Sequence, residues 1–216
     1  MYKAFFLLLI SFVASSDIIL IGDNRLVDMA DSLFNYELEQ ALCDAVRRKS
    51  YTKEPISYEE YNIEIIGGPM SCFSNSNSGQ FQQVHDKLKN AKDGTNVFFT
   101  GGIESMGSFN DIFVFYGKLA DKYTKLNFYV VPLIGVDENL SNIKNENIKE
   151  FNKEMSLKLE MLDFPNMKYK NILKEDDPTI LLLEEQELDI IKYVTKGIGF
   201  FKKGYEFILK AMLEGL

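Results

Sequence analysis

Short apolar runs alternate with longer amphipathic stretches along most of the chain. The short runs predict strands, because each is a near-continuous apolar segment that ends at a polar or turn residue. They cover residues 18–22, 61–66, 96–100, 126–133 and 167–172. The longer stretches repeat apolar residues at helical spacing. They predict helices over 25–49, 80–91, 109–123, 145–162 and, with a break at Gly197 or Gly204, 182–213.

This alternation of strands and helices predicts an α/β fold. Strands that are apolar on both faces favour a central parallel sheet, here of about five strands, with helices covering both sides. The Ser- and Asn-rich segment Ser71–Gly79 predicts a loop. Sites in such folds form outside the carboxyl ends of the strands. Those ends are Gly22-Asp23-Asn24, Gly67-Gly68-Pro69 and Gly101-Gly102-Ile103-Glu104.

The first 16 residues have the pattern of a secretory signal peptide. Lys3 precedes the apolar run Ala4–Ala14, and small residues follow at Ser15 and Ser16. We therefore expect cleavage before Asp17, although a first buried strand is the alternative. No later run is long enough to span a bilayer. The sequence thus predicts one exported, soluble domain over 17–216, secreted or extracellular, without an integral membrane segment.

Two cysteines and one glycosylation sequon agree with export. Cys43 and Cys72 could form one disulfide in an oxidising compartment. The spacing of cysteines and histidines matches no metal site, and we expect no cofactor. Asn139 begins the sequon Asn139-Leu140-Ser141 in a polar stretch, where N-glycosylation could occur.

The charge excludes some classes of partner. The 216 residues carry a net charge of -8, and no stretch gathers Lys or Arg into a stripe. Nucleic acid and anionic membranes bind cationic faces. Neither is therefore an expected partner.

The three strand ends resemble the motifs of the SGNH, or GDSL-type, hydrolases, which are esterases and lipases on a flavodoxin-like three-layer sandwich. The family's Gly-Asp-Ser block is similar to Gly22-Asp23-Asn24-Arg25, and its oxyanion glycine is similar to Gly68 or Gly67. Its Gly-x-Asn-Asp block falls on Gly102-Ile103-Glu104-Ser105, where Glu104 stands in place of the Asn. Its C-terminal Asp-x-x-His block falls on 174–186, with Asp176 or Asp177 as the Asp and Thr179 or Ile180 in place of the His.

The same comparison of motifs implies that this chain lacks the groups that carry out the family's chemistry. Serine acyl transfer needs a hydroxyl nucleophile, a base and donors to the oxyanion. Asn24 has no hydroxyl, and Glu104 would repel an oxyanion. The single histidine, His85, lies between the second and third strands, where an ordinary helix-surface role is expected.

Two substitutes for the lost groups are conceivable. Ser105, Ser71 or Ser74 could act as a relocated nucleophile, but none has a histidine beside it in the sequence. Asp23, Glu104 and Asp176 or Asp177 could converge into a carboxylate pair or a Ca²⁺ site. Against this, Asp23 and Asn24 are good N-cap residues, and the later acids can be solvated loop charges.

We therefore expect a secreted pseudohydrolase that binds rather than cleaves. Its cleft would use residues at the three strand ends: Asp23, Asn24, Arg25, Gly67, Gly68, Glu104 and Ser105. The ligand would be a small molecule, a glycan, an acylated ligand or a protein. The alternatives are an active esterase or acetyl-esterase with a relocated nucleophile, and a structural or adhesive secreted protein.

Overall fold

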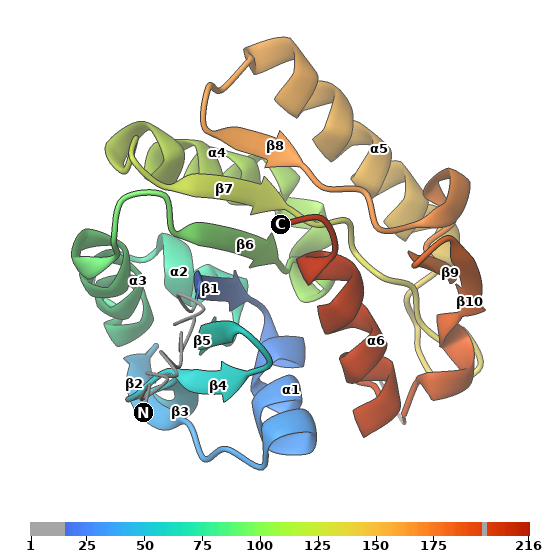
Figure 1. Cartoon of the computed structure of the whole chain (residues 1–216), viewed down its shortest axis with the longest axis horizontal. Helices are drawn as coiled ribbons and strands as arrows, with labels where there is room; N and C mark the ends of the chain where they lie inside the picture. Colours follow the sequence, from blue (N-terminus) through green and yellow to red (C-terminus); the bar gives the residue numbers. More distant parts are fainter. Residues whose placement is uncertain (1–15, 196–197) are drawn as a thin grey trace, which may run out of the picture.

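A computed structural model describes residues 16–195 and 198–216 and shows an α/β fold around one large mixed sheet (Figure 1). The predicted signal peptide therefore lies almost wholly outside the described residues. The strands of the main sheet are β1 (Ser16–Gly22), β2 (Glu39–Cys43), β3 (Val46–Tyr51), β4 (Ile56–Tyr58), β5 (Tyr61–Gly67), β6 (Asn96–Thr100), β7 (Asn127–Val130) and β8 (Met167–Tyr169).

The main sheet has eight strands and is mixed, whereas a parallel sheet of about five was expected. Five strands are parallel and lie in the order β5-β1-β6-β7-β8. Counted among themselves along the chain, they follow the order 2-1-3-4-5 of doubly wound sheets. The other three strands, β2, β3 and β4, pair antiparallel at one side and make the sheet mixed.

Helices cover both faces of the sheet and divide the core in two. The helices are α1 (Asn24–Phe34), α2 (Met70–Ser74), α3 (Gly79–Asn90), α4 (Phe109–Lys122), α5 (Asn145–Leu162) and α6 (Lys202–Leu213). On one face, α2 to α5 pack around Ile19 and Ile21 of β1. On the other, α1 and α6 pack around Ile18 and Leu20. The two faces of β1 thus supply both cores, as the period-2 geometry of a strand requires.

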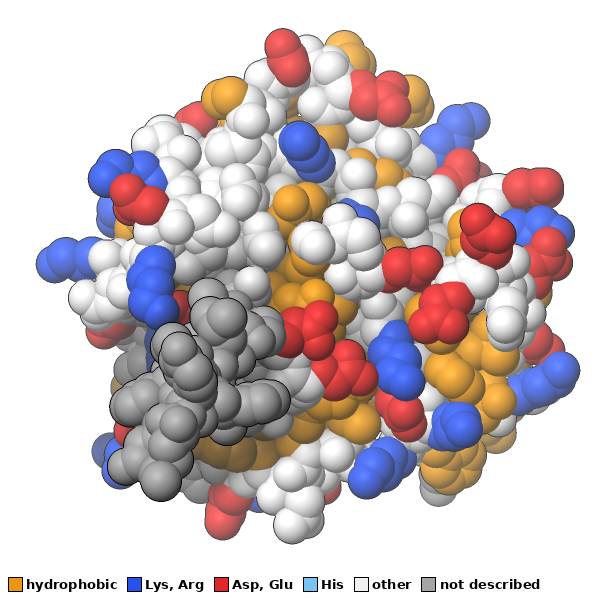
Figure 2. Space-filling view, in the orientation of Figure 1, with side chains coloured by type: hydrophobic (Ala, Val, Ile, Leu, Met, Phe, Trp, Pro, Cys, Tyr) orange, Lys and Arg blue, Asp and Glu red, His pale blue; other side chains and the backbone are white. Residues whose placement is uncertain are grey.

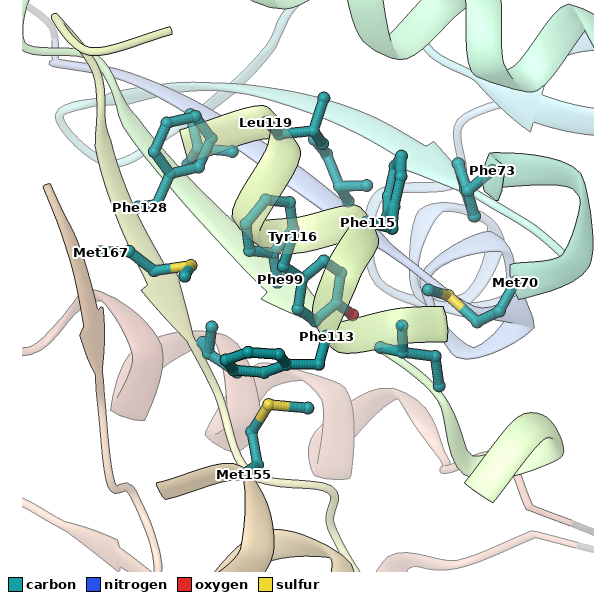
Figure 3. Close-up of a cluster of buried hydrophobic side chains, with 14 of the residues drawn as sticks. Met70, Phe73, Phe99, Phe113, Phe115, Tyr116, Leu119, Phe128, Met155 and Met167 are labelled. Carbon is teal, nitrogen blue, oxygen red and sulfur yellow. The ribbon is translucent and has the colours of Figure 1, made fainter. Parts of the chain in front are cut away.

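The core beneath α4 is rich in aromatic and methionine side chains, which pack with aliphatic ones such as Leu119 (Figure 3). Phe99 of β6 stacks on Tyr116 of α4, with ring centroids 4.0 Å apart and planes 8° apart. The Tyr116 hydroxyl donates a hydrogen bond to the carbonyl of Gly101, 3.2 Å away. This contact anchors α4 to the carboxyl end of β6.

The expected helix over 25–49 was wrong beyond residue 34. Asn35 adopts the left-handed conformation (φ 51°), and its N–H and that of Tyr36 donate to carbonyls of the last helical turn. The chain then forms the β2–β3 hairpin, whose turn residues Asp44 and Ala45 both have positive φ. Leu42 and Val46, which continued the helical spacing, are about half exposed.

The expected helix over 182–213 was also wrong in its first half. Residues 180–189 form a separate antiparallel hairpin of β9 (Ile180–Leu183) and β10 (Gln186–Asp189). Glu184 and Glu185 make its turn with positive φ. A run of four apolar residues fits a strand and a buried helix equally well, so periodicity alone could not separate them. Three short 3-10 helices complete the described elements: Ile103–Ser108, Lys174–Asp176 and Ile190–Tyr193.

Other expectations were close. The predicted helices over 80–91, 109–123 and 145–162 are α3, α4 and α5, and the five predicted strands match β1, β5, β6, β7 and β8. The segment expected as a loop, 71–79, instead begins with the short helix α2.

The described surface carries charges of both signs. On the face shown in Figure 2, acidic and basic side chains are interspersed with apolar ones rather than separated into stripes. Within residues 16–195 and 198–216, the helices are too short or too polar for any to cross a membrane.

A disulfide joins the β2–β3 hairpin to the helix that follows β5. Cys43, the last residue of β2, bonds Cys72 of α2, with Cα atoms 5.6 Å apart. Both side chains are buried. Because α2 follows Gly67-Gly68 directly, the bond fixes the position of the chain just beyond the carboxyl end of β5.

We expect the double substitution C43S/C72S to lower the free energy of unfolding. The cysteines are 29 residues apart, and constraining a loop of that length contributes about 3–4 kcal/mol. Urea denaturation of the oxidised protein, the variant and the dithiothreitol-reduced protein measures the effect. The reduced protein is the matched control, because it loses the bond but keeps both side chains. An identical urea midpoint in all three samples would contradict the prediction.

Candidate functional site

The residues beyond the first three parallel strands meet at one edge of the sheet. In the parallel register, Gly22 lies beside Gly67 of β5 on one side and beside Thr100 of β6 on the other. The three expected segments are therefore neighbours. The backbones after β1 and β6 approach each other closely at two glycines. A Cβ on Gly101 would lie 2.5 Å from the Asp23 nitrogen, and a Cβ on Gly22 would lie 2.6 Å from the Thr100 carbonyl oxygen.

Asp23 is a buried structural carboxylate. It is the N-cap of α1, and its Oδ1 accepts from the Arg25 N–H at 3.0 Å. Its Oδ2 accepts from the N–H groups of Gly102 and Ile103 at 3.1 and 3.3 Å. Only 1% of its surface is exposed, and its hydrogen bonds hold the segments after β1 and β6 together.

Asn24 and Glu104 form a direct pair across the two strand ends. The Asn24 Nδ2 group lies 3.0 Å from Glu104 Oε1 and 2.9 Å from Oε2, and donates to this carboxylate. Asn24 is half-buried and Glu104 is exposed. The two positions that the resemblance assigns to a nucleophile and an oxyanion donor thus contact each other.

The N–H of Gly68 is already engaged. It donates to the carbonyl of Gly22 at 3.1 Å. Gly68 has φ +137°, and a Cβ there would lie 2.0 Å from Nε2 of the buried Gln80, so only glycine fits. Gln80 in turn donates to the Gly67 carbonyl at 3.0 Å. These contacts fix the end of β5, but they leave the Gly68 N–H directed at protein rather than at a ligand.

Arg25 is buried, and its guanidinium binds backbone carbonyls from two remote segments. Its Nε donates to Ile198 at 2.7 Å, Nη1 to Ile134 at 2.7 Å and Nη2 to Gly135 at 3.2 Å. The guanidinium carbon also lies 5.0 Å from the ring centroid of Phe200. Burial lowers the pKa of Arg25, and the nearby Asp23 carboxylate opposes that change. The sequence placed Arg25 in a ligand cleft, whereas these bonds give it a structural role.

The segment before α6 also reaches this edge, which sequence reasoning missed. A Cβ on Gly199 would lie 3.1 to 3.3 Å from Asp28 Oδ2, Thr195 Oγ1 and the Tyr205 hydroxyl. Burial, followed by the charges of Asp23, Asp31 and Glu104, raises the pKa of Asp28. The paired glycines before the final helix, Gly197 and Gly199, were the available signal for a close approach.

The later acids bind their own neighbours. Asp176 accepts from the Asn171 amide at 3.1 Å. Asp177 accepts from the Thr179 N–H and hydroxyl at 2.8 and 2.7 Å. Among the described residues, neither joins Asp23 and Glu104 in a group compact enough to hold one ion. Within the described part of the chain, such a group is formed only by Cys43, Asp44 and Cys72, and the two cysteine sulfurs are bonded to each other.

Ser71 and Ser74, the alternative nucleophiles whose side chains are described, lie in α2 and are not brought to the histidine. His85 lies in α3, and its Nδ1 is 2.7 Å from the hydroxyl of Tyr123, which follows α4 at the amino edge of the sheet. Burial, with the charge of Lys122, lowers the pKa of His85. Ser71 is exposed on α2, at the opposite, carboxyl edge. The side chain of Ser105 lies outside the described structure.

Comparisons with known proteins give a fold likeness and no family. No protein-family model matches the sequence, and no curated protein matches it. A solved structure described as "a putative platelet activating factor from Streptococcus pneumonia" is similar, with a TM-score of 0.53 and 14% identity. The match covers 94% of this chain and 84% of that chain. At this identity the likeness shows the fold alone.

We expect Arg25→Lys to destabilise the protein strongly. A lysine keeps the charge but cannot reproduce the planar fork that reaches three carbonyls. Hydrogen bonds to charged groups contribute about 1.5–3 kcal/mol each, so a loss on the order of 3 kcal/mol should appear in urea denaturation. Arg47→Lys, on the exposed face of β3, is the matched control and should change stability by less than about 0.5 kcal/mol. Equal stability of the two variants would show that the carbonyl contacts of Arg25 are dispensable.

Proposed function

We propose that this chain is a divergent, secreted SGNH-hydrolase-like protein that has lost hydrolysis and retains a binding role. The Asn24–Glu104 pair is the observation that carries the proposal. An amide and a carboxylate occupy the positions where the hydrolases place a serine and an oxyanion-stabilising amide. Their mutual hydrogen bonds at 3.0 and 2.9 Å give a polar surface without a nucleophile.

The surrounding groups support the loss of acyl transfer. Acyl transfer needs a base within hydrogen-bond reach of a nucleophile and donors aimed at the oxyanion. The only histidine bonds Tyr123 near the other edge of the sheet, and the Gly68 N–H donates to Gly22. Glu104 adds negative charge where negative charge would develop.

The fold supports descent from a hydrolase scaffold. The parallel strands have the 2-1-3-4-5 order of a flavodoxin-like sandwich, to which three antiparallel strands are added. Ligands bind such sheets at the carboxyl edge, where the strand order reverses. That reversal lies between β1 and β6, beside Asn24 and Glu104.

Three further features support export. The apolar run over 4–14 follows Lys3, as in a signal peptide. The Cys43–Cys72 disulfide is typical of an oxidising compartment. Asn139 is exposed in a turn, so a glycan there would meet no packed side chain.

A hydroxyl-rich ligand, such as a glycan, fits the pair best among the ligand classes expected for this cleft. The Glu104 carboxylate has several acceptor sites, and the Asn24 amide supplies both an acceptor oxygen and donor hydrogens. Asp28 and Asp31 add negative charge nearby, which disfavours an anionic ligand.

Serine-directed probes should not label the protein. We expect no adduct by mass spectrometry after incubation of the mature chain with a fluorophosphonate, because the histidine bonds Tyr123 and no serine whose side chain is described. An active serine esterase is the positive control. Asn24→Ser, which restores the hydroxyl but places no histidine beside it, should also stay unlabelled. An adduct on Ser71, Ser105 or another serine of the parent protein would overturn the proposed loss of chemistry.

Binding through the pair can be tested on a glycan array. We expect the labelled protein to bind a subset of glycans and Glu104→Ala to reduce that signal about tenfold or more, as loss of a charged hydrogen-bond partner predicts. Glu60→Ala is the matched control, because Glu60 is an exposed acid at the amino end of β5. Absence of glycan binding by the parent, or equal signals for Glu104→Ala and the parent, would contradict a glycan site at this pair.

A further inference from the structure

A small cavity lies between the carboxyl edge of the sheet and helices α1 and α6. Its volume is about 40 Å³. The polar residues around it are Asp23, Arg25, Thr100 and Tyr205. The apolar lining comes from α1, the segment after β7 and the chain leading into and along α6: Leu26, Met29, Val131, Pro132, Leu133, Ile134, Phe200, Ile208 and Met212.

Two buried hydroxyls at this cavity lack a hydrogen-bond partner among the described residues. They are Thr100 Oγ1 and the Tyr205 hydroxyl. Tyr205 is 1% exposed. Burial raises the pKa of Tyr205, and a backbone contact from Phe200 to its oxygen opposes that change only in part. The hydroxyl therefore keeps its proton and remains a donor that needs an acceptor. A buried hydroxyl without a partner loses the hydrogen bonds that water gave it in the unfolded chain, so the native fold is expected to supply one.

The two charged residues that line the cavity, Asp23 and Arg25, already have hydrogen-bond partners. Asp23 accepts three backbone N–H groups, and Arg25 donates to three backbone carbonyls. A charged ligand would upset this balance in a mostly apolar enclosure. A neutral ligand that both donates and accepts hydrogen bonds would give the Thr100 and Tyr205 hydroxyls the partners that they lack.

We infer that this cavity binds ordered water, which connects Thr100 Oγ1 to the Tyr205 hydroxyl. One buried water needs about 10–15 Å³ of such volume and two to four polar partners. The cavity therefore has room for about three molecules, and the Thr100 and Tyr205 hydroxyls supply two polar partners. This water site is independent of the proposed function, because it lies behind Arg25 and not at the Asn24–Glu104 pair.

Three measurements on the unmodified protein test the inference. Oxygen-17 relaxation dispersion should detect at least one long-lived water. A high-resolution crystal structure should place it within hydrogen-bond distance of Thr100 or Tyr205. Crystals pressurised with xenon should show no xenon in the cavity, because xenon enters dry apolar cavities. Xenon density, or an organic molecule there in place of water, would overturn the inference.

Substitutions give an independent test. Thr100→Val and Tyr205→Phe each remove one water partner and should each lower the melting temperature by about 2–4 °C. If both residues hold the same water, the double variant should lose less than the sum of the two. Thr124→Val, at an exposed position, is the control and should leave the melting temperature unchanged. Single variants at least as stable as the parent would mean that the hydroxyls bind no water.

Discussion

The architecture depends on two buried charges that flank one half-buried amide. Asp23 and Arg25 follow β1 directly, and between them they bind backbone groups after β6, after β7 and before α6. A buried charge is tolerated only when its polar atoms are satisfied. The loops at this edge must therefore present carbonyls to Arg25 and N–H groups to Asp23. Three distant segments are thus positioned by a single turn of chain.

This constraint also shapes the chemistry of the edge. Because Asp23 fixes Gly102 and Ile103, the next residue, Glu104, is placed beside Asn24. The scaffold therefore does not need a catalytic group to hold the two strand ends together. Under the proposed function, loss of a nucleophile would leave the fold intact, which is the physical condition for a binding role to persist without catalysis.

Much of the fold was predictable from the sequence, and the failures share one cause. The central parallel strands and α3, α4 and α5 were clear, because long buried elements impose a consistent apolar period. The two hairpins were mistaken for helix. In both, non-glycine residues took positive φ at the turn: Asp44 and Ala45 in one, Glu184 and Glu185 in the other. Ala and Glu favour helices, so these turns left no break in the helical pattern. Apolar spacing cannot report a turn made by non-glycine residues.

The site was predictable only in part, for a different reason. Parallel strands place their carboxyl ends together, so the approach of Asn24 and Glu104 follows from the adjacency of β1 and β6. The partners of Arg25 are backbone carbonyls, which have no sequence signature. The approach of Gly199 depends on the path of a loop that follows an unforeseen hairpin. Side chains that bind side chains across neighbouring strands can thus be inferred from topology, whereas a side chain that binds remote backbone becomes evident only in three dimensions.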